Sequence, residues 1–199
     1  MRRLRFEGQI AGVGSSSGTR VVVGRWDLSP VGSFTDVMVQ TGRGHRVLLA
    51  PDEQVANLLA TTYAFDEVRL EPVTVAATPS QWWVESASLT MTITVGRRTR
   101  LGRLLRLIPR TITTQPAWAT AAEPISRIVT RGARTRGSTR AGTREWYGAT
   151  DVHAVVALTG RFDGVELGTL APVDPPCTFG FSSTPRRPSV TQVVTTIDG

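Results

Sequence analysis

Residues 88–95, with the sequence SLTMTITV, show the strictest alternation of apolar and polar side chains in this protein. The odd-numbered positions carry Leu, Met, Ile and Val, whereas the even-numbered positions carry Ser and Thr. A period of two residues predicts a β-strand that buries one face and leaves the other polar. We therefore expect either an antiparallel strand of a half-buried sheet or a barrel strand with one polar surface.

Short runs with strand-like composition recur along the rest of the chain and are separated by turn sequences. The turns include GSSSG at 14–18, SPVG at 29–32, TGRG at 41–44 and Asp163-Gly164. These connections are short, which favours antiparallel pairing of neighbouring strands. The predicted strands are residues 5–13, 19–26, 33–40, 45–50, 65–77, 81–86, 88–95, 143–158 and 189–197, with a hairpin over 160–170.

Residues 51–63, PDEQVANLLATTY, contain the clearest helix signal. Asp52 or the neighbouring Pro51 marks its start, and Glu53 places negative charge in the first turn. Apolar or small residues recur at positions 55, 58, 59 and 62, so one face of the helix is apolar. We expect this helix to cover the sheet.

Residues 96–110, GRRTRLGRLLRLIPR, predict a short basic amphipathic helix that Pro109 ends. Its apolar stripe comprises Leu101, Leu104, Leu105 and Ile108, and the other side carries Arg100, Arg103 and Arg106. Two outcomes are open. The leucines dock on the sheet and leave the arginines in water, or the helix lies in a membrane interface with its arginines on anionic headgroups.

These elements predict a mainly β protein of the α+β class. The expected architecture is an antiparallel β-barrel, or a wrapped antiparallel sheet, with an inserted helical segment. Roughly ten strands and two or three helical pieces are expected, with the helices inserted rather than alternating with strands. The 199 residues suit a single domain, in which residues 97–144 form a basic insertion of helix and loop.

The charge of the chain is unevenly distributed. All 23 basic residues are arginine, so mechanisms that need a lysine Schiff base or a lysine general base are excluded. The segment Arg97–Arg144 contains 12 arginines and one acid, a net charge of +11, whereas the remainder has a net charge of −4. Such asymmetry bears on partners and solubility rather than on the fold, and the segment is either a surface for an anionic partner or a solvated basic flank.

Membrane-spanning and secreted classes are not favoured. No apolar run approaches the roughly 18 residues of a transmembrane helix, and no hydrophobic region follows the basic N-terminal residues, as a signal peptide requires. Cys177 is the only cysteine, which excludes an internal disulfide. We therefore expect a cytoplasmic protein.

Few residues suit catalysis, and the best candidates lie in the strand predicted over 143–158. Asp151 and His153 share one strand face about 7 Å apart, together with Glu145 and Tyr147. An enzyme that uses Asp151 and His153, assisted by Glu145, is one hypothesis, and a histidine paired with its aspartate neighbour in a structural role is the other. No metal-site spacing occurs, so neither a metal nor another cofactor is expected.

Residues 29–39, SPVGSFTDVMV, resemble a segment of acetoacetate-decarboxylase-like β-barrels that leads into a pocket-lining strand. The resemblance implies that Asp36 occupies the acidic position of that segment and that Arg25 lies on the preceding strand. It does not imply decarboxylase activity, because the catalytic lysine has no counterpart here. The sequence segments FDEVR, REWYG and GFSSTPRRPS resemble segments of uncharacterised actinobacterial proteins of about 200 residues. This resemblance does not imply a function.

The leading hypothesis is a soluble β-barrel that binds a small, anionic or amphipathic molecule in its interior. The candidate ligand-binding residues are Arg25, Asp36, Tyr147 and His153. The alternative is an interaction module that docks on lipid headgroups or nucleic acid through the segment Arg97–Arg144. The candidates for that surface are Arg100, Arg103, Arg106, Arg134, Arg136 and Arg140. The oligomeric state is not specified by the sequence.

Overall fold

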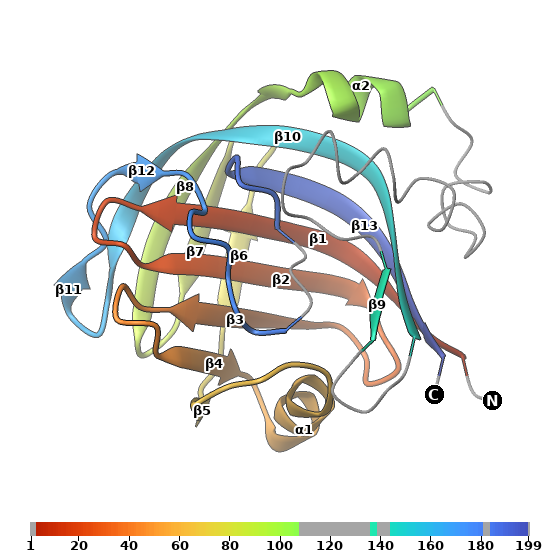
Figure 1. Ribbon diagram of the computed structural model, residues 1–199, viewed down its shortest axis with the longest axis horizontal. Helices are drawn as coiled ribbons and strands as arrows, with labels where there is room; N and C mark the ends of the chain where they lie inside the picture. The colour runs from red at the N-terminus through yellow and green to blue at the C-terminus, as the bar shows by residue number, and fades with distance from the viewer. Residues whose placement is uncertain (1–2, 108–135, 139–143, 181–183, 199) are drawn as a thin grey trace.

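The computed structural model describes residues 3–107, 136–138, 144–180 and 184–198, with side chains for residues 5–107, 148–180 and 184–194 (Figure 1). The described chain forms a 13-stranded sheet and two helices. The elements are β1 (Arg3–Ser15), β2 (Arg20–Leu28), β3 (Phe34–Gln40), β4 (Arg46–Ala50), α1 (Glu53–Thr62), β5 (Glu67–Leu70), β6 (Thr74–Ala77), β7 (Gln81–Glu85), β8 (Leu89–Arg98), α2 (Arg100–Leu105), β9 (Arg136–Ser138), β10 (Arg144–Phe162), β11 (Val165–Glu166), β12 (Leu170–Ala171) and β13 (Ser189–Asp198).

The sheet is curled so that its two edge strands approach each other. The strand order is β5-β4-β3-β2-β1-β13-β10-β8-β7-β6, yet the edge strands β5 and β6 are joined by only three residues, 71–73. Such a short link forces the two edges together. Figure 1 shows β1 to β4 across the front, β6 to β8 behind them, and β10 arching over the top. The predicted wrapped sheet of a mainly β protein is confirmed.

One pairing departs from the antiparallel pattern. Strands β4 and β5 are parallel, because α1 lies between them and carries the chain back to the same end of the sheet. The single strand predicted over 65–77 is also wrong. It divides at residues 71–73, where Pro72 lacks the N–H that a continuous ladder requires.

An inner core fills one part of the curl. It is formed by apolar side chains of β1 to β4, β7, β8, β10 and β13, so residues from both halves of the sheet meet inside. The alternation predicted over 88–95 is confirmed, because Leu89, Met91 and Ile93 are buried in this core whereas Thr90 is exposed. Burial of these side chains is the main stabilising contribution to the curl.

An outer layer covers the opposite face of β1 to β4. It consists of α1 and the segment 172–180, which crosses in front of the strands in Figure 1. Asp52 caps α1, since its Oδ1 accepts a hydrogen bond from the Val55 N–H at 2.8 Å. Val55, Ala56 and Leu59 pack against the sheet. The predicted covering helix is confirmed.

The long strand β10 is irregular, so the regular alternation expected along it is wrong. A register shift against β13 lies between Ala149 and Asp151, which separates the positions of Glu145 and Tyr147 from those of Asp151 and His153. Register shifts against β8 occur between His153 and Val155 and between Val155 and Ala157. As a result, Val155 and Leu158 both enter the inner core, whereas Val156 is 58% exposed. A β-bulge adds an unpaired residue and reverses the alternation, and no composition signal marks its position.

Polar contacts tie the edge strand β5 to the far side of the curl. Arg69 Nη1 donates to Asp163 Oδ1 at 2.5 Å, in the turn between β10 and β11, and to Ser88 Oγ at 2.9 Å. Glu71 accepts from the Ser88 N–H at 3.0 Å. The predicted Asp163-Gly164 hairpin is confirmed, with both residues at positive φ.

Most of the insertion predicted over 97–144 lies outside the described residues. Within the described chain, no helix has the length and apolar character to span a membrane.

Candidate functional site

A row of polar residues crosses the sheet on five neighbouring strands. Gln9 of β1 lies opposite Arg25 of β2 and Gln192 of β13, Arg25 lies opposite Thr35 of β3, and Gln192 lies opposite Asp151 of β10. Residues directly opposite in antiparallel strands project to the same face. We call these five residues the polar row. All are partly buried.

The polar row lies on the inner face of the curl, next to the inner core. Two residues further along four of the five strands, β3, β2, β1 and β13, lie Val37, Val23, Ala11 and Val190, all members of that core. Side chains two positions apart share a strand face, so the polar row continues the surface that the core occupies. The inner face is therefore divided into a packed apolar part and a partly exposed polar part.

Arg98 extends the polar row to β8. Its Nε lies 2.8 Å from Asp151 Oδ1 and 3.0 Å from Oδ2. Burial alone would raise the pKa of Asp151, but hydrogen bonds from Arg98 and from the Val152 N–H outweigh it and hold this pKa below its usual range. The Asp151 carboxylate is thus kept ionised and bound to the guanidinium.

Arg25 has donors that its neighbours do not use fully. Its Nη1 donates to Gln9 Oε1 at 3.2 Å, and its Nη2 lies 3.6 Å from Asp27 Oδ1, which exceeds hydrogen-bonding distance. The Arg25 side chain is 38% exposed. Among the described residues, the Gln192 side chain has no hydrogen-bond partner. Both residues can therefore bind a polar group from solution.

His153 lies beside Asp151, but its imidazole ring forms its hydrogen bond with the backbone of Gly96. Its Nδ1 is 3.3 Å from the Gly96 carbonyl oxygen, an acceptor, so Nδ1 carries the proton in this contact. Its Nε2 is 3.6 Å from Asp151 Oδ2, too long for a hydrogen bond. The structure brings the two predicted residues together, and Arg98 rather than His153 is the close partner of the carboxylate.

Asp36 faces the other side of the sheet from Arg25. It pairs with Gly24, and its side chain lies between the sheet and the outer layer, where it is 1% exposed. Trp26 Nε1 donates to Asp36 Oδ1 at 3.0 Å. Burial raises the pKa of Asp36 to about 7, although the Trp26 hydrogen bond acts in the opposite direction.

Several remaining candidates lie outside the part of the chain that the structure describes. The side chains of Glu145, Tyr147 and Arg136, and Arg134 and Arg140 as a whole, lie outside the described residues. The second histidine of the chain, His45, lies in the turn before β4, with Nε2 at 3.0 Å from Glu67 Oε2. No group of three or more His, Cys, Asp or Glu side chains that could hold a metal ion occurs in the described part.

Reasoning from the sequence missed Gln9, Gln192, Thr35 and Arg98. Each lies two or three positions from an apolar core residue on its own strand, which is the only signal they leave. Their proximity depends on the pairing of β1 with β13 and of β13 with β10, strands from opposite ends of the chain. Pairing of such distant strands is not readable from local patterns.

No protein-family model and no curated protein matches this chain. Among solved structures, it is similar to the crystal structure of acetoacetate decarboxylase from Legionella pneumophila subsp. pneumophila, at 9% identity and a TM-score of 0.41. The similarity covers 99% of this chain and 82% of that chain. The expected distant resemblance of the chain to an acetoacetate-decarboxylase structure is thus found, and it says nothing about activity. The resemblance to actinobacterial proteins stays a prediction.

Proposed function

We propose that this protein binds a small molecule carrying a carboxylate or phosphate at the polar row. The observation that supports the proposal is the continuity of the inner face, where five in-register polar residues follow directly after the packed apolar core. Open ends of β-barrels with a few convergent polar groups are common binding sites for small molecules.

The chemistry of the row favours an anionic group at Arg25. A guanidinium binds carboxylates and phosphates through a planar pair of N–H donors. Asp27 competes weakly for this guanidinium, since the distance from Oδ1 to Nη2 is 3.6 Å. Arg98 is less available, because Asp151 occupies its Nε. Gln9 and Gln192 offer amide donors and acceptors between the two arginines.

The geometry also limits the size of the molecule. Arg25 and Asp151 are separated by three strand-to-strand spacings, from β2 through β1 and β13 to β10. Such spacings amount to about 14 Å along the sheet. A ligand of this length, with an anionic end at Arg25 and hydrogen-bonding groups that reach Gln9 and Gln192, suits the surface. Asp36 is not part of the proposed site because it faces the outer layer.

The enzyme hypothesis has weaker support. An Asp151 carboxylate that Arg98 holds ionised is a poor proton acceptor, and His153 Nδ1 is engaged with a backbone carbonyl. We therefore propose binding without catalysis. A cytoplasmic location belongs to the same proposal, because a single buried thiol, Cys177, is typical of proteins in reducing compartments.

Isothermal titration calorimetry tests this function with three probes: inorganic phosphate, butyrate and octanoate. We expect saturable binding of at least one probe to the wild-type protein. Arg25→Gln should weaken that binding by about tenfold or more, the amount a charge-assisted hydrogen bond contributes. Arg161→Gln, an exposed arginine on β10 away from the polar row, serves as the matched control and should leave binding unchanged. Absence of saturable heat with all three probes, or equal binding by Arg25→Gln, would contradict the proposal.

A further inference from the structure

Helix α2 docks on β10 through Gly102, and two of its leucines, Leu101 and Leu105, are partly buried. Gly102 is the buried residue of this helix, and a Cβ atom placed there would lie 2.4 Å from the Val152 carbonyl oxygen. Only glycine permits so close an approach of the two backbones. The Thr99 N–H, at the helix start, also donates to the Val152 carbonyl at 2.9 Å.

This docking turns the helix away from the orientation that its sequence predicts. Leu104 is 55% exposed, and Leu107, in the turn that follows α2, is 80% exposed. Arg100 and Arg103 are exposed as well, so positions 100, 103, 104 and 107 form one solvent-facing surface at helical spacing. The predicted segregation of leucines from arginines is therefore wrong at Leu104, which is exposed beside the arginines, whereas Leu101 and Leu105 are partly buried.

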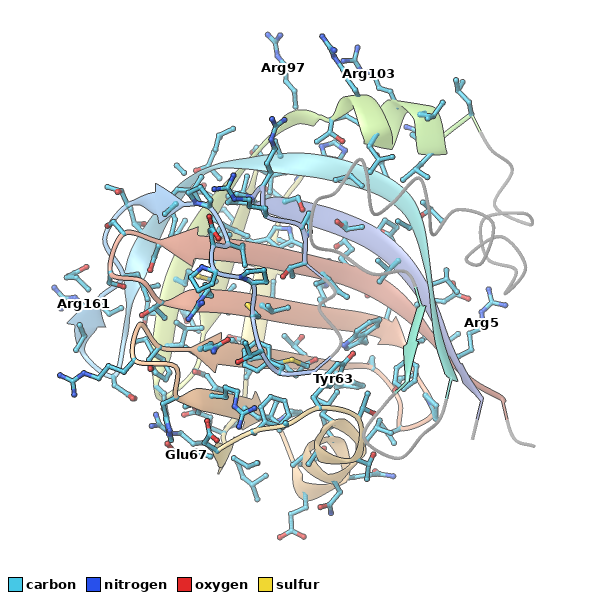
Figure 2. All side chains as sticks on the ribbon, viewed as in Figure 1. Arg5, Tyr63, Glu67, Arg97, Arg103 and Arg161 are labelled. Atoms are coloured by element: carbon cyan, nitrogen blue, oxygen red, sulfur yellow. The ribbon has the colours of Figure 1, made fainter. Side chains whose placement is uncertain are left out.

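The charge of this surface is uncompensated within the described chain. Arg97 and Arg106 are exposed beside the surface, and no ion pair among the described residues involves any of the four arginines at 97, 100, 103 and 106. Figure 2 shows Arg97 and Arg103 pointing away from the body of the protein on the same side. Val156 of β10, also exposed, lies next to Gly96 at the start of this segment.

We propose that this surface, together with Arg97 and Arg106 beside it, docks on a membrane surface that contains anionic lipid. The four arginines match negatively charged headgroups, and Leu104 and Leu107 project between them, where they can enter the boundary of headgroups and acyl chains. Nucleic acid is a poorer match for this surface, because its phosphates would bind the arginines while both leucines would stay exposed to water. The proposal is independent of ligand binding at the polar row.

Vesicle co-sedimentation tests the proposal. The full-length protein is mixed with phosphatidylcholine vesicles that contain or lack phosphatidylserine, at low and high salt. Binding should require phosphatidylserine and should fall at high salt. Arg100→Gln with Arg103→Gln should weaken binding by about fivefold per arginine. Leu104→Ser with Leu107→Ser should weaken it by about tenfold or more.

A matched pair of variants separates a specific surface from overall charge. Arg103→Gln with Leu107→Ser removes one exposed arginine and one exposed apolar side chain from the proposed surface. Arg161→Gln with Val165→Ser removes the same two kinds of side chain elsewhere on the protein, where Val165 is 67% exposed and Figure 2 labels Arg161. Only the first pair should reduce vesicle binding. Circular dichroism confirms that each variant is folded.

Three results would overturn the proposal. The first is no co-sedimentation of the wild-type protein with phosphatidylserine vesicles at low salt. The second is equal loss of binding in the two matched pairs. The third is wild-type vesicle binding by the leucine variant together with binding of duplex DNA, which would assign the arginines to nucleic-acid phosphates instead.

Discussion

The guanidinium of Arg98 lies against the carboxylate of Asp151, with Nε 2.8 Å from Oδ1 and 3.0 Å from Oδ2. This contact joins β8 to β10 at the last pair of their ladder, Arg98 opposite His153. Beyond it the chain leaves the sheet and enters α2. The ion pair therefore has two consequences, for the polar row that it extends and for the helix that follows it.

Arg98→Gln should lower the free energy of unfolding by about 1–3 kcal/mol, because it leaves the partly buried Asp151 carboxylate without its charged partner. Urea denaturation at neutral pH measures this change. Arg186→Gln is the matched control, since its pair with Asp174 is about half exposed and should contribute about 0–1 kcal/mol. An equal change in the free energy of unfolding for the two substitutions would show that the Arg98–Asp151 ion pair stabilises the fold no more than an exposed ion pair does.

The same pair predicts a loss of stability in acid. The folded-state pKa of Asp151 is lowered, so the pair stabilises the protein above the unfolded pKa and is lost as pH falls through the folded value. Wild-type protein should therefore lose more stability than Arg98→Gln on acidification below about pH 4. Urea denaturation over an acidic pH series measures the free energy of unfolding of both proteins. An equal loss of stability in the two proteins as pH falls would contradict the expectation.

Asp36 should make the free energy of unfolding fall as pH rises, which is the opposite of the effect of Asp151. Its pKa rises from 3.8 to about 7 on folding, so between these values the folded state holds a proton that the unfolded state has released. The unfolded state then binds fewer protons, and the free energy of unfolding falls as pH rises through this window. The loss amounts to at most about 4 kcal/mol and is complete above about pH 7.

Asp36→Asn tests this by removing the charge and keeping an oxygen that accepts from Trp26 Nε1. The variant should be more stable than wild type at about pH 8, and its stability should change less between about pH 5 and pH 8. Asp27→Asn, at an exposed carboxylate on the same hairpin, is the control and should leave the pH profile unchanged. A wild-type profile that Asp36→Asn does not flatten would contradict burial of an ionisable Asp36.

Gly102→Ala should destabilise the protein although alanine favours helices. In an exposed helix this substitution stabilises by about 1 kcal/mol. Here the new Cβ meets the Val152 carbonyl, so α2 must move away from β10. Hydrogen exchange of the Thr99 N–H, which bonds to that carbonyl, should become faster. Slower or unchanged exchange would show that α2 does not dock through this glycine.

Short sequence patterns correctly predicted those strands, helices and turns that are specified by residues close together in the chain. The alternation over 88–95, the Asp52 cap and the Asp163-Gly164 turn each specify their own element, and the structure confirms all three. The bulges in β10 and the break at Pro72 were missed, because tertiary pairing decides where a strand bends or divides.

The candidate site was predicted only in part. Arg25 and His153 were expected to line the interior, and Asp151 was expected to share the strand face of His153. The structure has all three on the inner face. Asp36 was grouped with them because the resemblance of residues 29–39 implied an acidic pocket position, yet Asp36 pairs with Gly24 rather than with Arg25 and faces the outer layer. Gln9 and Gln192 could be recognised as members of the site only from the pairing of β1 with β13, which places them opposite each other.

The most direct test of the central claim is nuclear magnetic resonance of the side chains in the polar row during titration with the probe that binds in calorimetry. We expect saturable shifts of the Arg25 Nε–H signal and of the Gln9 and Gln192 amide signals, with a common dissociation constant. The Arg161 Nε–H signal, away from the row, should not move. Shifts confined to residues outside the polar row would contradict a ligand site on the inner face of the sheet.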